Sequence, residues 1–248
     1  MPTPIKIPAT VEEVICHNST VKSFVLKPKR PAPRFRPGQF LHLALDTYDP
    51  SSHWPESRVF SIANSPTRSD TLRVTFAIKG KFTRRMFDEV RPKDTVWLKL
   101  PFGSFTFADN EKPIVLVAGG TGITPFLSFL EFAMDEQMNN PIDLWYGVRG
   151  QGHLIFTEIL DECARKLRNF RCRYFLEEAP GRALPAARAE RDCLFTGMLD
   201  IDKIYRLTER PEASVFYLSG PPLMIQTFRK KLLRRGVGEA NIRVDDWE

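Results

Sequence analysis

Three glycines lie close together near the middle of this 248-residue chain, in the segment GGTGITP at residues 119–125. Residues without a side chain let a backbone approach a ligand closely. A helix that begins just after them directs free N–H groups and the positive end of its dipole toward a phosphate. Thr124 can cap such a helix, and Pro125 suits its first turn. The segment therefore suggests phosphate binding. A tight turn without a ligand is the alternative, because the spacing is not GxGxxG.

The elements around the glycines have the pattern of an α/β domain. Residues 114–118, IVLVA, form a continuous apolar run, which is typical of a strand buried on both faces. Similar runs follow and alternate with helical stretches, and this alternation predicts a parallel sheet wrapped by helices. The further apolar runs are 142–147, 172–176 and 215–219, and the helical stretches are 125–137, 155–167 and 222–235.

The first 110 residues have a different pattern, that of short β segments separated by Pro and Gly. Six segments rich in β-branched and aromatic residues predict an antiparallel barrel, and one helical stretch at about 81–90 interrupts them. The segments are 10–16, 20–26, 40–45, 58–63, 72–79 and 95–100. We therefore expect two domains, a β-barrel at 1–110 and an α/β domain at 111–248, each of ordinary size.

Composition excludes several classes of protein. No apolar run approaches the roughly 20 residues that span a bilayer, and the N-terminus lacks the apolar core of a signal peptide, so we expect a cytoplasmic protein. The four cysteines are scattered without a metal-binding spacing, which predicts free thiols and no iron–sulfur or zinc site. The four histidines are equally dispersed.

The formal net charge is +6 and is uneven along the chain. Residues 1–110 contain 17 Lys and Arg against 10 Asp and Glu. Such a basic half could meet nucleic acid, the phosphates of an anionic cofactor or an acidic protein. Nucleic acid is the least favoured, because no helix-turn-helix, zinc-finger or RNP-like pattern accompanies the charge.

Five short motifs occur in a definite order along the chain. They are RVFS at 58–61, GKFT at 80–83, GGTGITP at 119–125, YGVR at 146–149 and SGPPLM at 219–224. Their order resembles the ferredoxin-NADP reductase superfamily, in which a flavin-binding barrel precedes an α/β domain that binds a nicotinamide nucleotide. RPGQF at 36–40 and DDW at 245–247 extend the resemblance over nearly the whole chain. Each motif is weak alone, but the ordered set is specific.

The resemblance implies a flavin site on the barrel. Arg58 offers a planar charged fork for a flavin phosphate. In the family, the residue at the position of Phe60 is usually a Tyr that packs against the isoalloxazine ring of the flavin. The hydroxyl at the position of Ser61 hydrogen-bonds near N5 of that ring. GKFT matches the family's Gly-x-x-Ser/Thr turn at a helix start, and Arg84 and Arg85 add positive charge. The flavin contacts expected are Arg58, Val59, Phe60, Ser61, Ala77, Lys79, Gly80, Lys81, Phe82 and Thr83. The alternative is that these are ordinary strand and surface residues.

The resemblance also implies a nucleotide site on the second domain, where residues 119–124 would hold the pyrophosphate. Ser219 departs from the family's Cys-Gly-Pro, whose Cys lies beside the nicotinamide, but it keeps a small polar group. Trp247 stands where relatives have an aromatic residue that stacks near the flavin or nicotinamide; it could instead close a sheet edge. The residues expected at hydride transfer are Ser61, Ser219 and Trp247. The other nucleotide contacts expected are Gly120, Thr121, Gly122, Thr124, Arg149, Gly220, Pro221 and Met224.

These features together predict an NAD(P)H-dependent flavoprotein reductase. A hydride would pass from the nicotinamide to the flavin, and electrons would leave for an external acceptor: a ferredoxin, a flavodoxin, an oxygenase component or a free acceptor. The resemblance favours FAD over FMN. A flavin-binding redox sensor or regulatory subunit with little turnover is the alternative, which the departures at Phe60 and Ser219 support.

Two finer expectations concern the nucleotide and the acceptor. Residues 176–179, LEEA, occupy the region where the family holds the 2′-phosphate of NADP, and carboxylates there favour NADH. Arg173 or Arg182 could reverse that preference. A basic segment at residues 27–36 could steer an acidic acceptor protein, or could simply be solvated surface. Its cations are Lys27, Lys29, Arg30, Arg34 and Arg36.

Overall fold

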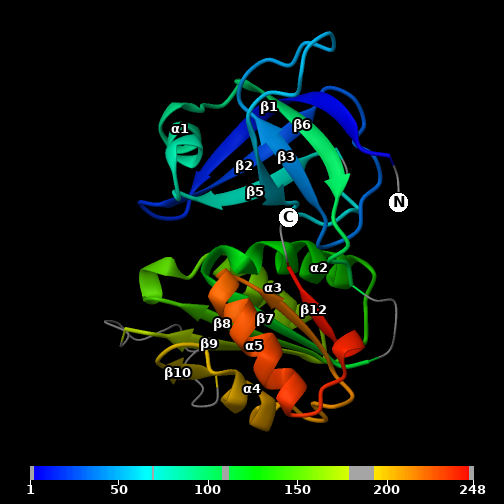
Figure 1. The fold of residues 1–248 in the computed structure, drawn as a ribbon, viewed down its shortest axis with the longest axis vertical. Helices are drawn as coiled ribbons and strands as arrows, with labels where there is room; N and C mark the ends of the chain where they lie inside the picture. Colours follow the sequence, from blue (N-terminus) through cyan, green and yellow to red (C-terminus); the bar gives the residue numbers. More distant parts are fainter. Residues whose placement is uncertain (1–2, 69, 108–111, 179–192, 246–248) are drawn as a thin grey trace. The chain divides into compact units, whose positions relative to one another are not determined.

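A computed structural model describes residues 3–68, 70–107, 112–178 and 193–245. The chain forms two compact units (Figure 1). The first comprises Met1–Phe107 together with Thr124–Asp135, and the second comprises Ala108–Ile123 together with Glu136–Glu248. Each unit contains one six-stranded sheet, antiparallel in the first and parallel in the second. The predicted fold class is confirmed.

The first unit is a nearly closed antiparallel barrel with strand order β4-β3-β6-β1-β2-β5. The edge strands β4 and β5 also contact each other. The strands are β1 (Ile5–Cys16), β2 (Val21–Pro28), β3 (Phe40–Ala44), β4 (Ser57–Ser61), β5 (Leu72–Ala77) and β6 (Thr95–Phe102). Helix α1 (Lys81–Glu89) follows β5 and buries Phe82 and Met86.

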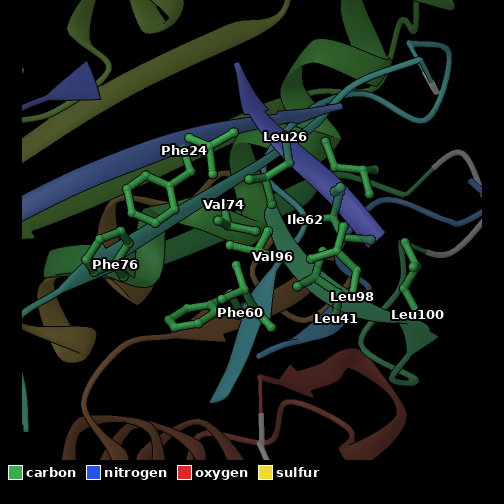
Figure 2. Packing of buried hydrophobic residues seen from close by; sticks show 14 of the residues in the cluster. Phe24, Leu26, Leu41, Phe60, Ile62, Val74, Phe76, Val96, Leu98 and Leu100 are labelled. Carbon is green, nitrogen blue, oxygen red and sulfur yellow. The ribbon is translucent and has the colours of Figure 1, made fainter. Parts of the chain in front are cut away.

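Alternating apolar residues of these strands form the barrel core (Figure 2). Leu41 and Phe60 are register partners on β3 and β4, and both point into this core. Phe24 on β2 and Phe76 on β5 pack edge to face with ring centroids 4.9 Å apart. Because side chains alternate between the two faces of a strand, one set of positions fills the barrel and the other set remains outside.

Helix α2 (Thr124–Asp135) belongs to the barrel unit, although the α/β domain surrounds it in sequence. A row of polar contacts fixes it to the loop after β4. Ser128 Oγ donates to the Asn64 carbonyl at 2.7 Å. The buried Glu131 carboxylate accepts from Ser65 N at 3.0 Å and from the Arg73 guanidinium at 2.5 Å. Breaking such a buried pair by removing one partner costs about 3–5 kcal/mol, so α2 is firmly attached.

The second unit has a parallel sheet in the order β10-β9-β8-β7-β11-β12. The strands are β7 (Ile114–Gly119), β8 (Ile142–Val148), β9 (Phe170–Leu176), β10 (Leu194–Thr196), β11 (Val215–Ser219) and β12 (Ile242–Val244). The α-helices are α3 (Thr157–Lys166), α4 (Ile201–Leu207) and α5 (Pro222–Arg234). Short 3-10 helices are η1 (Gly120–Ile123), η2 (Gln151–His153) and η4 (Glu239–Asn241). In Figure 1, α5 lies across this sheet.

The central strands of this sheet are buried on both faces, as their continuous apolar runs predicted. Val115 and Val117 of β7 pack with residues of α4 and α5 on one face. Leu116 between them is also fully buried, and α3 packs beside β9. The carboxyl ends of β8, β7 and β11 therefore lie side by side, which is where ligands bind in open α/β sheets.

The strands and helices that carried strong patterns all form, and their bounds agree within a few residues; β1 begins five residues earlier than expected. The sequence did not predict β10, α4 or β12. The segments 182–191 and 246–248 lie outside the described residues. Among those that are described, no helix has both the length and the apolar character needed to cross a bilayer.

Candidate functional site

Two expected flavin motifs, 22 residues apart in sequence, meet on the barrel. The Arg58 guanidinium lies 5.0 Å from the centroid of the Phe82 ring, which belongs to the first turn of α1. Arg58 donates to the Ser57 carbonyl at 2.9 Å and to the exposed Glu56 carboxylate at 2.7 Å. About half of the Arg58 side chain remains exposed. The cation is thus held beside the helix start and stays accessible.

The turn before α1 is open and is organised by the Thr83 hydroxyl. Thr83 Oγ1 accepts from Lys79 N at 2.8 Å and from Gly80 N at 3.1 Å. A Cβ added at Gly80 would meet no atom within 4 Å. The first turn of α1 contains no acidic residue, so its positive end is not neutralised from within the helix. Lys81 is exposed beside this turn.

The other expected flavin contacts differ in accessibility. Phe60 is buried and packs 6.0 Å from Phe76, centroid to centroid. Ser61 is also buried, whereas Val59 and Ala77 are half-buried. Two neighbouring cations differ as well: Arg84 is exposed, but Arg85 makes a two-pronged contact with Asp46, at 2.7 and 3.2 Å. Exposed cations in and beside the turn are thus Lys79, Lys81 and Arg84. Arg58 and Arg85 are also partly exposed but pair with Glu56 and Asp46.

In the second unit the glycine segment meets the segment after β11. Ala118 and Ser219 are register partners on adjacent strands. A Cβ added at Gly122 would lie 2.3 Å from the Ser219 carbonyl oxygen, and one added at Gly119 would lie 2.9 Å from both Met224 and Pro221. The motifs at 119–125 and 219–224, about 100 residues apart in sequence, are thus in direct contact.

For Gly119 and Gly122, the structure gives a different reason for a glycine than the close approach of a ligand that the sequence suggested. At Gly119 and Gly122, a side chain would strike the protein's own chain, so the packing itself excludes one. Only Gly120, with φ +56 and nothing within 4 Å of an added Cβ, leaves open space. Residues 120–123 form a 3-10 turn that runs directly into α2, whose first residue is Thr124, one residue earlier than expected. Thr124 is buried, and Thr121 is half-buried.

Ser219 is buried at the end of β11 and is bonded to an acidic residue. Its hydroxyl donates to the Asp245 carboxylate at 2.8 Å, and Asp245 N donates to the Leu218 carbonyl at 2.9 Å. Asp245 is also buried. The Ser219 hydroxyl is therefore held in one orientation. Sequence reasoning gave Asp245 no role, although it follows β12, the strand that pairs beside β11. Trp247 lies outside the described residues.

The ends of β8 and β9 bring Arg149 to the carboxylates at 177–178. Glu178 N donates to the Arg149 carbonyl at 2.8 Å, and Arg149 Nε donates to the Glu178 carboxylate at 3.0 Å. Both side chains are mostly exposed. Arg173 is occupied elsewhere: it donates to Asp143 at 3.1 Å and lies over the Trp145 ring. Across the described part of the chain, no group of His, Cys, Asp or Glu is arranged to hold a metal ion.

Residues 116–230 match the model of a protein family that is described as "Oxidoreductase NAD-binding domain". The reductase component of propane 2-monooxygenase from Mycolicibacterium smegmatis is 30% identical over 211 residues, which are 83% of this chain and 57% of the relative. The structure of the Amycolatopsis cytochrome P450 reductase GcoB matches with a TM-score of 0.82 at 24% identity and covers 98% of this chain and 70% of that one.

A ferredoxin NADP+ reductase from Neisseria gonorrhoeae, solved with bound FAD and NADP, matches with a TM-score of 0.75 at 22% identity and covers 98% of both chains. Residues 116–230 thus match an oxidoreductase NAD-binding domain, and the fold of the chain is the one that these solved reductases share. At their low identities, the two solved structures show the shared fold. The chain spans somewhat more than half the length of the curated relative described above.

Proposed function

We propose that this chain is the reductase module of an electron-transfer system: it binds FAD on the barrel and a nicotinamide nucleotide on the parallel sheet, and it passes electrons to an external acceptor. The observation that carries the proposal is the meeting of four sequence motifs in two clusters, Arg58 with the first turn of α1, and Gly122 with Ser219. Each cluster places cations or free backbone at the start of a helix or at strand ends, where anionic cofactors bind.

The residues of the barrel cluster fit an anionic flavin cofactor. Arg58 and Lys81 supply accessible positive charge, Thr83 fixes the turn, and Gly80 leaves space for a phosphate. When bound, the flavin supplies the redox chemistry, since it can take a hydride and give up electrons. The chain's own residues bind and orient: Arg58 would hold the phosphates, and the Ser61 hydroxyl would lie near the ring system. FAD is favoured, and the bound FAD of the Neisseria gonorrhoeae relative supports that choice.

The residues of the sheet cluster fit a dinucleotide, and NADH is the favoured one. Arg149, a cation beside the expected ribose site, donates a hydrogen bond to Glu178 and is therefore already paired with a carboxylate. Arg173 is committed to the half-buried Asp143. A 2′-phosphate would therefore meet carboxylates, whereas a 2′-hydroxyl could donate to one. The Ser219 hydroxyl, oriented by Asp245, would lie beside the nicotinamide.

The acceptor is proposed to be an acidic protein, such as an oxygenase component or a ferredoxin. The name of the Mycolicibacterium smegmatis relative, the reductase component of a monooxygenase, supports an oxygenase component as the acceptor. Arg30 donates to the Lys6 carbonyl at 2.9 Å, which places the basic segment 27–36 against β1. Lys27 pairs with Glu12 at 3.2 Å. Steering by such a surface weakens as salt rises, because the Debye length falls from about 10 Å at 0.1 M to about 3 Å at 1 M.

Steady-state kinetics of the purified FAD-loaded protein test this function. With an acidic acceptor protein, kcat/KM should be clearly higher for NADH than for NADPH. The variant Glu178→Gln should narrow that difference. Glu209→Gln, which breaks an exposed pair with Arg171 near the amino end of β9, serves as a matched control. The rate with the acceptor should fall from 0.1 M to 1 M salt and when Arg30, Arg34 and Arg36 are neutralised together. A preference for NADPH would overturn the nucleotide choice, and a rate indifferent to salt would overturn the acidic acceptor.

A further inference from the structure

Between β3 and β4 lies a loop, residues 45–56, to which the sequence motifs assign no role. It ends directly before Ser57 and Arg58, and the Arg58 guanidinium lies 5.0 Å from the centroid of the Phe82 ring on α1. Long loops without secondary structure of their own are uncommon in compact domains, and many of them are functional. Whatever fixes this loop also fixes the segment that carries Arg58.

The loop leaves and re-enters the barrel at one row of residues. Ser57 of β4 is the register partner of Ala44 of β3, and Ala44 is the register partner of Trp97 of β6. Residues opposite each other in antiparallel strands point to the same side of the sheet. This row points outward, since Leu43 and Leu98 next to it belong to the barrel core. Ala44 is nevertheless fully buried, so this part of the outer side is covered.

Three aromatic rings and one lysine hold the loop against this row. The Tyr48 ring lies 5.3 Å from the Trp54 ring and 5.5 Å from the Trp97 ring, measured between centroids. Lys6 of β1 donates to the Tyr48 hydroxyl at 2.8 Å, and its ammonium group lies 4.3 Å from the centroid of the Tyr48 ring. All four residues are half-buried. Ring packing and the cation together therefore fix Tyr48 and Trp54 on the barrel.

A hydrogen bond connects this aromatic cluster to the segment that carries Arg58. The Trp54 Nε1–H group donates to Ser57 Oγ at 3.0 Å. On the other side of the same residue, Arg58 donates to the Ser57 carbonyl at 2.9 Å. Ser57 thus receives one bond from the cluster and one from the cation. The position of the Trp54 ring is in this way passed on to Arg58.

The start of the same loop is attached to helix α1. The Asp46 carboxylate accepts from the Arg85 guanidinium at 2.7 and 3.2 Å, and Arg85 belongs to α1. The loop is therefore fixed at its start to α1 and at its end to Arg58. These are the two parts that meet in the barrel cluster, so the loop helps to set their separation.

We propose that Trp54 is a positioning residue for flavin binding: its N–H group fixes Ser57 and thereby holds the Arg58 guanidinium beside the first turn of α1. The inference rests on the proposed flavin site. Trp54 acts through Arg58 and not by contact with the cofactor. A cation that is already in place loses less conformational freedom when a phosphate binds, and such preorganisation raises affinity.

Fluorescence titration of the full chain with FAD tests the proposal. Trp54→Phe keeps an aromatic ring beside Tyr48 but removes the donor, so the FAD Kd should rise about three- to tenfold, as expected for one lost hydrogen bond. Ser57→Ala removes the acceptor and should raise the Kd by a similar factor. Trp97→Phe is the matched control. It makes the same change in the same cluster, outside the bond to Ser57, and should bind FAD as the wild type does.

A double-mutant cycle with Arg58→Ala distinguishes positioning from a general effect on the fold. In a protein that already carries Arg58→Ala, Trp54→Phe should leave the FAD Kd unchanged, because the group through which it acts is gone. An equal loss of affinity in both backgrounds overturns the proposal. So does an unchanged Kd for Trp54→Phe alone. Urea unfolding shows that each variant is folded, and Ser57→Ala carries the same cycle if Trp54→Phe is not.

A failure of this inference differs from a failure of the function on which it rests. A wild-type protein that binds FAD equally well with and without the Trp54 N–H group contradicts the positioning role alone. A protein whose FAD Kd depends on Trp54 but which neither NADH nor NADPH reduces contradicts the reductase function alone. A wild-type protein that binds no FAD contradicts the flavin site, and the positioning role with it.

Discussion

The two candidate cofactor segments, one in each unit, place their glycines in opposite surroundings. At Gly80, before α1, an added Cβ would meet nothing within 4 Å, and the backbone is extended at φ −172, which any residue can adopt. At Gly122 an added Cβ would strike the backbone of Ser219 and Gly220, at 2.3 and 2.6 Å. Nothing in the chain itself demands a glycine at 80, whereas the packing demands one at 122.

The two candidate sites are therefore built by different means. The sheet site is assembled by close contact between two segments of backbone, so its shape is part of the fold. The barrel site is an open turn fixed by the Thr83 hydroxyl and flanked by accessible cations. Substitutions at the sheet site should therefore act on stability and nucleotide binding together, whereas those at the barrel site should act on flavin binding alone.

The largest effect is expected from Gly122→Ala. The added methyl group meets backbone atoms that cannot rotate away, and such overpacking costs about 1–3 kcal/mol of unfolding free energy or more. Urea unfolding should show this loss, and any folded protein should bind ADP-ribose weakly. Gly238→Ala is the control, because its Cβ would enter open space at φ −61. Equal stability of the two variants would mean that the contact with Ser219 is not as close as described.

Arg58→Ala should have the next largest effect, and on flavin binding only. A charge-assisted hydrogen bond to a phosphate contributes about 1.5–3 kcal/mol, so the FAD Kd should rise by roughly tenfold or more. Stability should change little, because the Arg58–Glu56 pair is exposed. Glu56→Gln separates the two roles: it removes the partner and keeps the cation, so it should retain FAD. Full flavin retention by Arg58→Ala through dialysis would remove Arg58 from the site.

Gly80→Ala should have the smallest effect and gives the sharpest contrast with Gly122→Ala. The chain has room for the methyl group, so the free energy of unfolding should stay within about 0.5 kcal/mol of the wild type. Only a phosphate seated against the turn would meet the added group, so FAD should bind more weakly than in the wild type. Fluorescence titration with FAD measures this. Unchanged FAD affinity would indicate that the phosphates do not approach Gly80.

The sequence predicted the architecture well because both units follow strong patterns. Alternation marked the barrel strands, and the apolar run at 114–118 marked the central strand of the parallel sheet. The strands β10 and β12 are only three residues long, which is too short for an alternation of apolar and polar residues to be recognised in the sequence. The grouping of α2 with the barrel depends on the contact between Glu131 and Arg73, which are far apart in sequence.

The roles of the site residues stay predictions, but the motifs identified two pairs of segments that meet in the structure. Motif spacing could not reveal that Gly122 faces the backbone of Ser219, or that Gly119 faces Met224 and Pro221. Asp245 was missed because its contact with Ser219 requires β12 to pair beside β11, which no local pattern shows.

The most direct test of the central claim is anaerobic mixing of the FAD-loaded protein with NADH while the visible flavin band is followed. We expect the band to bleach, and to bleach more slowly when the transferred hydrogen of NADH is deuterium. Gly122→Ala should slow the bleaching, whereas Gly238→Ala should not. A band that persists at saturating NADH and saturating NADPH would contradict the reductase function and favour a flavin-binding sensor.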